Sequence, residues 1–131
     1  MRDRAVVDAS VLAALFLREA GWQEISARLD ALTQVCSVPF FRFEVANAVW
    51  KRPEIPDSQA PTLAYMVFDF PVDDAFLPEV STLSMRLART HQLPFYDAAY
   101  IAQARARGLP LWTLDRRQAQ VARLEHVEVI S

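Results

Sequence analysis

Short apolar runs, some of which end in an acidic residue, alternate with helical segments along most of this 131-residue chain. The first run, residues 5–7, is closed by Asp8, and a later one, residues 111–114, is closed by Asp115. Such runs are typical of buried strands, and helices between them favour parallel pairing with helices on both faces. We therefore expect an α/β fold, a three-layer α/β/α sandwich with a central, mostly parallel sheet of about four to five strands.

Apolar periodicity sets the expected elements. We predict strands at residues 4–8, 34–38, 68–72, 111–114 and 127–130. We predict helices at residues 10–17, 22–32, 40–52, 62–67, 76–87, 95–107 and 116–124. The strand at 68–72 is expected at an edge, because Pro71 cannot pair in the middle of a sheet. A single domain over 1–131 is expected, since about 100–150 residues is the usual size of one domain.

The composition suits a chain that folds on its hydrophobic core, with a hydrophobic fraction of 53%. Cys36 is the one cysteine, which excludes a disulfide framework and a cysteine-based zinc site, and its apolar neighbours predict a buried side chain. The first four residues are mostly charged and the apolar stretch that follows is broken at Asp8, so no signal peptide is expected. No uninterrupted apolar run approaches the roughly 20 residues of a membrane span. We expect a cytoplasmic protein without membrane contact.

The net charge of −2 argues against a protein that coats nucleic acid through charge alone. If four of the acidic residues, Asp8, Glu44, Asp97 and Asp115, belong to a metal site, the rest of the chain carries +2. Thirteen of the 14 basic residues are arginines, whose planar guanidinium groups suit phosphate. The composition therefore permits a nucleic-acid substrate without requiring one.

Three acids, Asp8, Asp97 and Asp115, lie near the starts of predicted helices. Each could simply cap its helix, an interaction worth about 1 kcal/mol. However, Asp8 and Asp115 also follow predicted strands, and in parallel sheets ligands bind beyond the carboxyl ends of the strands. Capping and a shared binding site both remain open for these three residues.

Glu44 lies in an apolar helix, in one narrow stripe with Asn47 and Lys51. Because most of that helix must be packed, its polar stripe faces either solvent or a cleft. In solvent, Glu44 would pair with Lys51. In a cleft, Glu44 would lie near Asp8 and Asp115, because its helix follows a buried strand. We favour the cleft.

Four carboxylates gathered at one edge of a sheet would need a cation. Two unit charges about 4 Å apart repel by roughly 4 kcal/mol at an effective dielectric near 20. Mg²⁺ or Mn²⁺ would relieve this repulsion, because both bind hard oxygen ligands. A metal-bound water becomes a nucleophile near neutral pH, and metal ions stabilise the oxygens of a phosphodiester displacement. A cluster of this kind therefore predicts phosphodiester hydrolysis.

Four segments of the chain resemble the PIN domain, specifically the small VapC-type toxins of bacterial toxin–antitoxin pairs. In chain order they are Val6-Val7-Asp8-Ala9-Ser10, Glu44-Val45-Ala46-Asn47-Ala48, Tyr96-Asp97-Ala98-Ala99-Tyr100-Ile101-Ala102 and Leu111-Trp112-Thr113-Leu114-Asp115. Their order and spacing span almost the whole chain. The segment around Asp97, in register with the other three, is the most specific part of the resemblance.

The resemblance implies a PIN-like fold and a Mg²⁺-dependent endoribonuclease, with Mn²⁺ as a substitute, that cleaves structured RNA. It also implies a homodimer and inhibition by a cognate antitoxin protein. By position, the catalytic and metal-binding quartet would be Asp8, Glu44, Asp97 and Asp115. Ser10 and Thr113 would orient carboxylates or water, and Asn47 would be an accessory polar group beside Glu44.

Two features depart from the family pattern. Arg116 and Arg117 follow Asp115 where some relatives carry a further Asp or Asn, so a residue that could help to hold a second metal ion is missing, and these arginines could instead contact phosphate. Residues 53–61 are shorter and richer in proline than the usual helical connection, so the antitoxin contacts could differ. An antitoxin segment could dock on the apolar residues of 22–29, or these could belong to the core.

Other aspartate-based α/β families fit less well. A phosphoacceptor receiver domain needs a lysine after its last strand, whereas Lys51 lies inside a predicted helix. A haloacid-dehalogenase-like phosphatase needs a second Asp two residues after Asp8, and Ser10 is there. The alternative that remains is a non-catalytic module of the same fold, whose acidic cleft holds a basic peptide or an antitoxin arginine.

Overall fold

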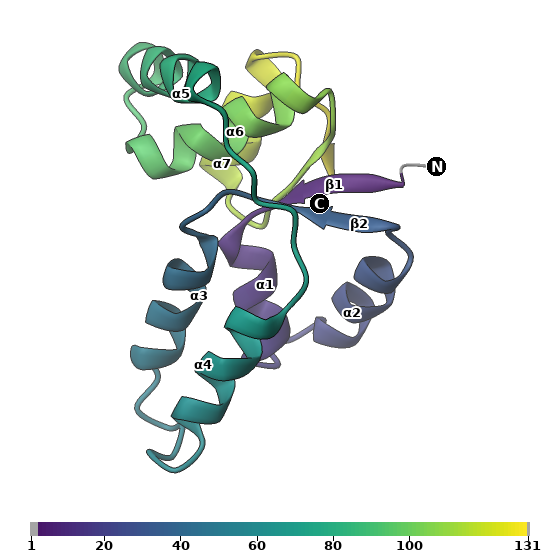
Figure 1. Ribbon diagram of the computed structural model, residues 1–131, viewed down its shortest axis with the longest axis vertical. Coiled ribbons are helices and arrows are strands. Elements are labelled where there is room, and N and C mark those ends of the chain that lie inside the picture. Colours follow the sequence, from purple (N-terminus) through teal and green to yellow (C-terminus); the bar gives the residue numbers. More distant parts are fainter. Residues whose placement is uncertain (1–2, 131) are drawn as a thin grey trace.

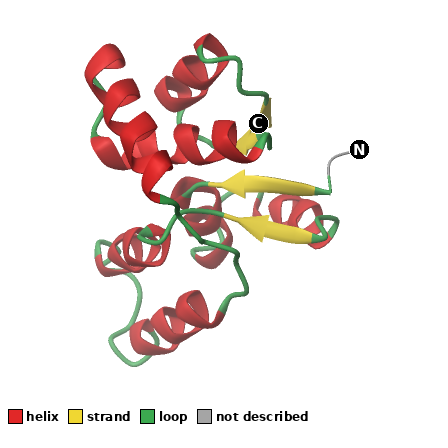
Figure 2. Ribbon diagram, turned by 45° about the horizontal axis from the view of Figure 1, so that its top comes forward, coloured by secondary structure: helices red, strands yellow, loops and turns green. Residues whose placement is uncertain are grey.

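Parallel strands form the sheet of the computed structural model, which describes residues 3–130. In chain order the strands are β1 (Arg4–Val7), β2 (Gln34–Cys36), β3 (Leu111–Trp112) and β4 (Val129–Ile130). Their order across the four-stranded sheet is β2-β1-β3-β4, and every neighbouring pair is parallel. Figure 2 shows the arrows of β1 and β2 pointing in the same direction. The predicted parallel α/β architecture is confirmed. The expected single domain over 1–131 includes Met1, Arg2 and Ser131, which lie outside the described residues.

Seven helices within the described residues cover this sheet. They are α1 (Ala9–Phe16), α2 (Trp22–Asp30), α3 (Phe41–Trp50), α4 (Ala60–Asp69), α5 (Pro78–His91), α6 (Phe95–Arg107) and α7 (Arg116–Leu124). Figure 1 shows α1–α4 on one side of the strands and α5–α7 on the other. Ala5, Val6 and Val7 of β1 are fully buried because both faces of the strand are covered, which explains a continuous rather than alternating apolar run.

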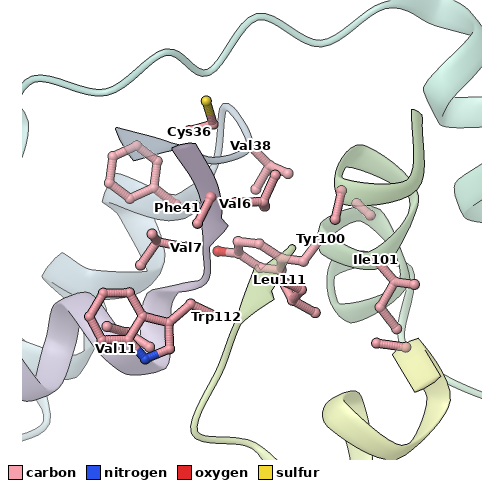
Figure 3. Close-up of a cluster of buried hydrophobic side chains, with 14 of the residues drawn as sticks. Val6, Val7, Val11, Cys36, Val38, Phe41, Tyr100, Ile101, Leu111 and Trp112 are labelled. Carbon is pink, nitrogen blue, oxygen red and sulfur yellow. The ribbon is translucent and has the colours of Figure 1, made fainter. Parts of the chain in front are cut away.

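The core connects the two helical layers through the sheet. Phe41 of α3 and Tyr100 of α6 are among the largest fully buried side chains. Figure 3 shows Tyr100 projecting from α6 toward β1, with Val7 nearby. Cys36 is fully buried, as predicted for a small apolar side chain. Ile25 and Leu29 of α2 belong to the core, which favours the packing interpretation for these two residues over an antitoxin surface, whereas Trp22 is half-buried and lies outside that core.

The predicted strand at 68–72 is wrong. Helix α4 continues through Asp69, and the chain then passes Pro71, which has no backbone N–H for a ladder. Pairing with β2 occurs only later, as an isolated parallel bridge between Asp73 and Cys36. Arg42 explains why the helix persists to this point: its guanidinium donates to carbonyls at the end of α4, including that of Val67 at 2.8 Å. Burying a helix end requires such partners for its last carbonyls.

Other boundaries differ by a few residues. Helix α4 begins at Ala60, earlier than predicted, because Pro61 is compatible with the first turn of a helix. Phe76 precedes α5, which begins at Pro78. Strand β3 ends at Trp112, two residues earlier than predicted, although the backbone N–H of Thr113 still donates to the carbonyl of Ile130 at 3.4 Å. Between residues 3 and 130, no helix has the length and apolar character needed to cross a membrane.

Candidate functional site

Asp8 lies at the carboxyl end of β1 and is also the N-cap of α1. Its Oδ1 accepts hydrogen bonds from the backbone N–H of Ser10 at 3.0 Å and of Val11 at 3.4 Å, and from the Ser10 hydroxyl at 2.5 Å. The capping interpretation is therefore correct for Asp8. It does not exclude a site, because a carboxylate has further lone pairs to offer.

Thr113 ties Asp8 to the neighbouring strand. Its hydroxyl lies 2.5 Å from Asp8 Oδ2 and accepts a hydrogen bond from the backbone N–H of Asp115 at 3.0 Å. The Ser10 hydroxyl accepts from the backbone N–H of Leu114 at 3.0 Å. Both predicted hydroxyl residues thus orient Asp8, and they join the ends of β1 and β3.

The charge of Asp8 is costly where it lies. Only 4% of the residue is exposed, and this burial raises the pKa of its carboxyl from the ordinary 3.8 to about 6, against the opposing effect of the Ser10 and Thr113 hydrogen bonds. All of these donors are neutral. They fix the orientation of the carboxylate without cancelling its charge.

Glu44 faces the same region from α3. Its Oε1 accepts a hydrogen bond from the Tyr100 hydroxyl at 2.5 Å, and it forms no ion pair with Lys51 within the described residues. Burial raises the pKa of Glu44, and the nearby charge of Asp97 raises it further. Burial likewise raises the pKa of Tyr100, followed by the charge of Glu44, so the hydroxyl remains a donor. The cleft interpretation of Glu44 is therefore favoured over the solvated one.

Asp97 and Asp115 approach from the other helical layer. Asp97 lies in the first turn of α6. The N-cap of this helix is Pro94, so Asp97 does not serve as the cap. Burial raises its pKa, and the charge of Asp115 adds to the effect. Asp115 is the N-cap of α7 and accepts from the backbone N–H of Gln118 at 3.1 Å. It is the most exposed of the four acids.

Electrostatic contact therefore runs from Asp115 through Asp97 to Glu44, and Tyr100 connects Glu44 with Asp8. No ion pair among residues 3–130 includes any of these acids. In the described part of the chain, no three His, Cys, Asp or Glu side chains are grouped closely enough to hold a metal ion. The four acids share one region but are not drawn together as ligands of one ion.

The donor chemistry nevertheless fits a hard divalent cation. Carboxylate oxygens are the preferred ligands of Mg²⁺ and Mn²⁺, and the Asp97 carboxylate receives no hydrogen bond from any described residue. Raised pKa values at Asp8, Glu44 and Asp97 mark uncompensated negative charge that a cation would relieve.

A small cleft opens beside Glu44, between α1 and α3. It has a volume of about 310 Å³ and is lined by Ala9, Ser10, Ala13, Glu44, Asn47, Ala48 and Lys51. Asn47 is exposed in this cleft and forms no hydrogen bond with the four acids, and its accessory role stays a prediction. Lys51 is exposed too, which leaves it accessible to an anion there.

The two arginines after Asp115 differ. Arg117 donates to the carbonyl of His91 at 2.8 Å, so its guanidinium is held toward the end of α5. Arg116 is exposed and makes no hydrogen bond or ion pair within residues 3–130. The predicted phosphate contact of these two arginines stays a prediction.

Sequence reasoning missed Tyr100 and Gln118 as partners of the acids. Tyr100 stood within the segment around Asp97, but nothing in the sequence showed that its hydroxyl would reach Glu44 on another helix. Gln118 could have been found: an acidic N-cap followed three residues later by Gln, as in Asp115 to Gln118, has the spacing of a capping box.

Comparison with known proteins agrees with this architecture. The family model of the PIN domain matches residues 5–124, so the chain belongs to the PIN-domain family. A curated relative, Ribonuclease VapC3 of Pyrobaculum aerophilum, is 30% identical over 122 residues, which cover 89% of this chain and 93% of that protein.

Solved structures share the fold over nearly the whole chain. PAE2754 from Pyrobaculum aerophilum is 29% identical, with a TM-score of 0.66 over 92% of this chain and 87% of that one. FitAcB from Neisseria gonorrhoeae is 18% identical, with a TM-score of 0.68 over 97% and 96% of the two chains. FitAB bound to an IR36 DNA fragment is also 18% identical, with a TM-score of 0.69 over 96% and 93%. At 18% identity these last two show the fold alone.

Proposed function

We propose that this PIN-domain protein is a Mg²⁺-dependent endoribonuclease, with Mn²⁺ as a substitute, and the toxin of a toxin–antitoxin pair. The catalytic and metal-binding residues proposed are Asp8, Glu44, Asp97 and Asp115. The observation that carries the proposal is the set of carboxylates with raised pKa values and no cationic partner among the described residues. Acids in such a state are unfavourable for the fold and are therefore candidates for function.

The chain's own groups have distinct tasks in this proposal. Asp8 is the fixed ligand, since Ser10 and Thr113 hold both of its oxygens in place. Glu44 is oriented by Tyr100 through Oε1, which leaves Oε2 for an ion. A bound divalent ion would supply an activated water and neutralise charge on the phosphodiester oxygens.

Asp97 and Asp115 would complete the charge of the site from the opposite side. Asp115 is exposed and its Oδ1 already caps α7, so it would act at the rim, through Oδ2 or a bridging water. Titration with the metal ion would measure how many ions the site holds, because a single ion would bind to the buried acids first.

RNA is the substrate that we propose, for two reasons. The chain is 30% identical over most of its length to a protein named as a ribonuclease. In addition, Lys51 lines the cleft beside Glu44, and Arg116 is exposed next to Asp115, so cations flank the acids along a possible strand path. These flanking charges would hold phosphates on either side of the scissile bond.

A cognate antitoxin and a second copy of the chain are the proposed protein partners, from the similarity to VapC-type proteins. Large exposed apolar side chains support partner binding on α3 and α4: Phe43 is 67% exposed, Trp50 79% and Tyr65 72%. Phe43 and Trp50 lie seven residues apart, on one face of α3. Patches of this kind usually mark interaction surfaces.

The experiment is RNA cleavage by purified, antitoxin-free protein on a broad pool of structured RNA, with Mg²⁺, Mn²⁺ or EDTA. We expect cleavage with either metal, none with EDTA, and loss of cleavage in Asp97→Asn. An inactive protein that still binds arginine-rich peptide would support the non-catalytic module instead. Cleavage that persists in EDTA would contradict the proposed chemistry.

A further inference from the structure

Gln118 is a buried polar residue that connects the candidate site without belonging to the acidic quartet. It lies in the first turn of α7 and is 2% exposed. Its backbone N–H donates to Asp115 Oδ1 at 3.1 Å. Its side-chain amide reaches in the opposite direction, to two other parts of the site.

The two ends of this amide bind different elements. Nε2 donates to the backbone carbonyl of Asp97 at 3.0 Å, and Oε1 lies 2.9 Å from the Thr113 hydroxyl. The Asp97 carbonyl can only accept, so Nε2 must face it and Oε1 must face Thr113. The orientation of the amide is therefore determined by its partners rather than interchangeable.

The Thr113 hydroxyl connects Gln118 with Asp8. Its hydroxyl has a single proton and two acceptors, Asp8 Oδ2 at 2.5 Å and Gln118 Oε1 at 2.9 Å, and it also accepts from the backbone N–H of Asp115. One glutamine thus contacts, directly or through one hydroxyl, the segments that carry Asp8, Asp97 and Asp115. These segments come from α6, from the end of β1 and from the start of α7.

We propose that Gln118 is a positioning residue that sets the mutual placement of Asp8, Asp97 and Asp115 for a divalent cation. The inference rests on the proposed function. Carboxylates that repel one another do not hold a common geometry unaided, and partners that orient metal ligands commonly alter metal affinity by about 10- to 100-fold. Gln118 is the described side chain that bonds to both the α6 segment and the β3–α7 turn.

Gln103 provides a matched control. It is also a buried glutamine, 1% exposed, and its Nε2 donates to the carbonyls of Ser37 at 2.9 Å and Ala75 at 2.8 Å. None of these partners is one of the four acids. Replacing Gln103 therefore removes a comparable number of buried hydrogen bonds without touching the candidate site.

The test compares Gln118→Met with Gln103→Met, because methionine keeps the volume of the side chain and removes its polar atoms. Mn²⁺ binding is measured by isothermal titration calorimetry, and stability by thermal melting. We expect both variants to lower the melting temperature, whereas only Gln118→Met should raise the Kd for Mn²⁺, by about 10-fold or more. Cleavage by Gln118→Met should recover at saturating Mn²⁺ with an unchanged KM for RNA.

Equal Mn²⁺ affinity in Gln118→Met and the wild type would overturn the inference and leave the proposed function intact. Equal weakening in both methionine variants would overturn it too, since the effect would then be general loosening. A wild-type protein that binds no Mn²⁺ would overturn both proposals. If Gln118→Met does not fold, Gln118→Asn keeps an amide but is one methylene too short to span both partners, and it should raise the Kd about 3-fold, short of the range for full loss.

Discussion

Asp8 and Asp73 lie beside neighbouring strands of the sheet but differ in their partners. Asp73, which bridges to β2, is held by the Arg107 guanidinium at 2.8 Å, and this hydrogen bond lowers the pKa of the Asp73 carboxyl. Asp8, at the end of β1, has only neutral donors around it, and burial raises its pKa to about 6. The same residue type therefore has opposite electrostatic consequences a strand apart.

The difference in partners distinguishes acids that stabilise the fold from acids that destabilise it. A carboxylate paired with arginine stabilises the native state at neutral pH, whereas a buried carboxylate without a cation destabilises it. At Asp8 and Glu44, hydroxyl donors from Thr113 and Tyr100 fix the oxygens but leave the charge in place. That arrangement keeps the negative charge available to an external cation.

The largest expected difference between the two aspartates is in catalysis. Asp8→Asn should lower the rate of RNA cleavage by about 10³-fold, roughly 4 kcal/mol, because it removes a charged ligand from the reaction centre. Asp73→Asn should leave the rate within about 3-fold of wild type, since Asp73 lies on the β2 edge and not among the four acids. Single-turnover cleavage with Mn²⁺ measures both, and similar losses in the two variants would erase the distinction.

The next largest effect concerns stability and pH. Folded Asp8 keeps its proton up to about pH 6, whereas the unfolded residue releases it near 3.8. The folded state thus binds more protons in between, so without metal its free energy of unfolding should fall as pH rises from about 4 to 6, by about 3 kcal/mol in total, and then level off. The measurement is urea unfolding in EDTA of the wild type relative to Asp8→Asn, which lacks this titration.

Asp73 should change the pH dependence of stability in the opposite direction to Asp8. Its pKa is lowered in the folded state, so its stabilisation is present above the ordinary value of 3.8 and is lost as pH falls through the lowered pKa. Unfolding of Asp73→Asn against wild type in the same pH series checks this. For Asp8, the difference in the free energy of unfolding between the wild type and Asp8→Asn should change between pH 4 and 7. If it does not change, the Asp8 carboxyl is not buried as described.

The smallest effect is expected at Arg107, the cation that pairs with Asp73. Arg107→Ala removes hydrogen bonds to both oxygens of Asp73 and to the Ala75 carbonyl, and should lower the free energy of unfolding by about 1–2 kcal/mol, because the pair is partly solvated. Arg105→Ala, which removes a more exposed pair with Glu125, should cost under about 1 kcal/mol. Neither variant should alter metal-dependent cleavage, and a Mn²⁺-dependent defect in Arg107→Ala would blur the comparison.

Much of the fold could be predicted from the sequence, because strand and helix periods are local. The helices over 95–107 and 116–124 begin and end at the predicted residues. Asp8 and Asp115 could be placed at the same edge because parallel strands end together. The strand at 68–72 failed because an apolar run beside Pro71 does not reveal that Arg42, a distant residue, caps a longer helix there.

The candidate site could be predicted in its charges but not in its contacts. The acids could be found from their positions at helix starts and strand ends, because each of these features is recognised from a few neighbouring residues. The Tyr100 bond to Glu44 joins residues 56 positions apart, and the Thr113 bond to Asp8 spans 105. Such pairs depend on how the helices pack, which no single segment encodes.

Calorimetric titration of Mn²⁺ into the wild type, Asp97→Asn and Asp73→Asn at pH 7.5 tests whether the acids bind a divalent cation. We expect binding by the wild type and by Asp73→Asn with similar affinity, and a Kd raised at least about 10-fold in Asp97→Asn. Binding that is absent in the wild type at millimolar Mn²⁺, or equal in all three proteins, would contradict this expectation.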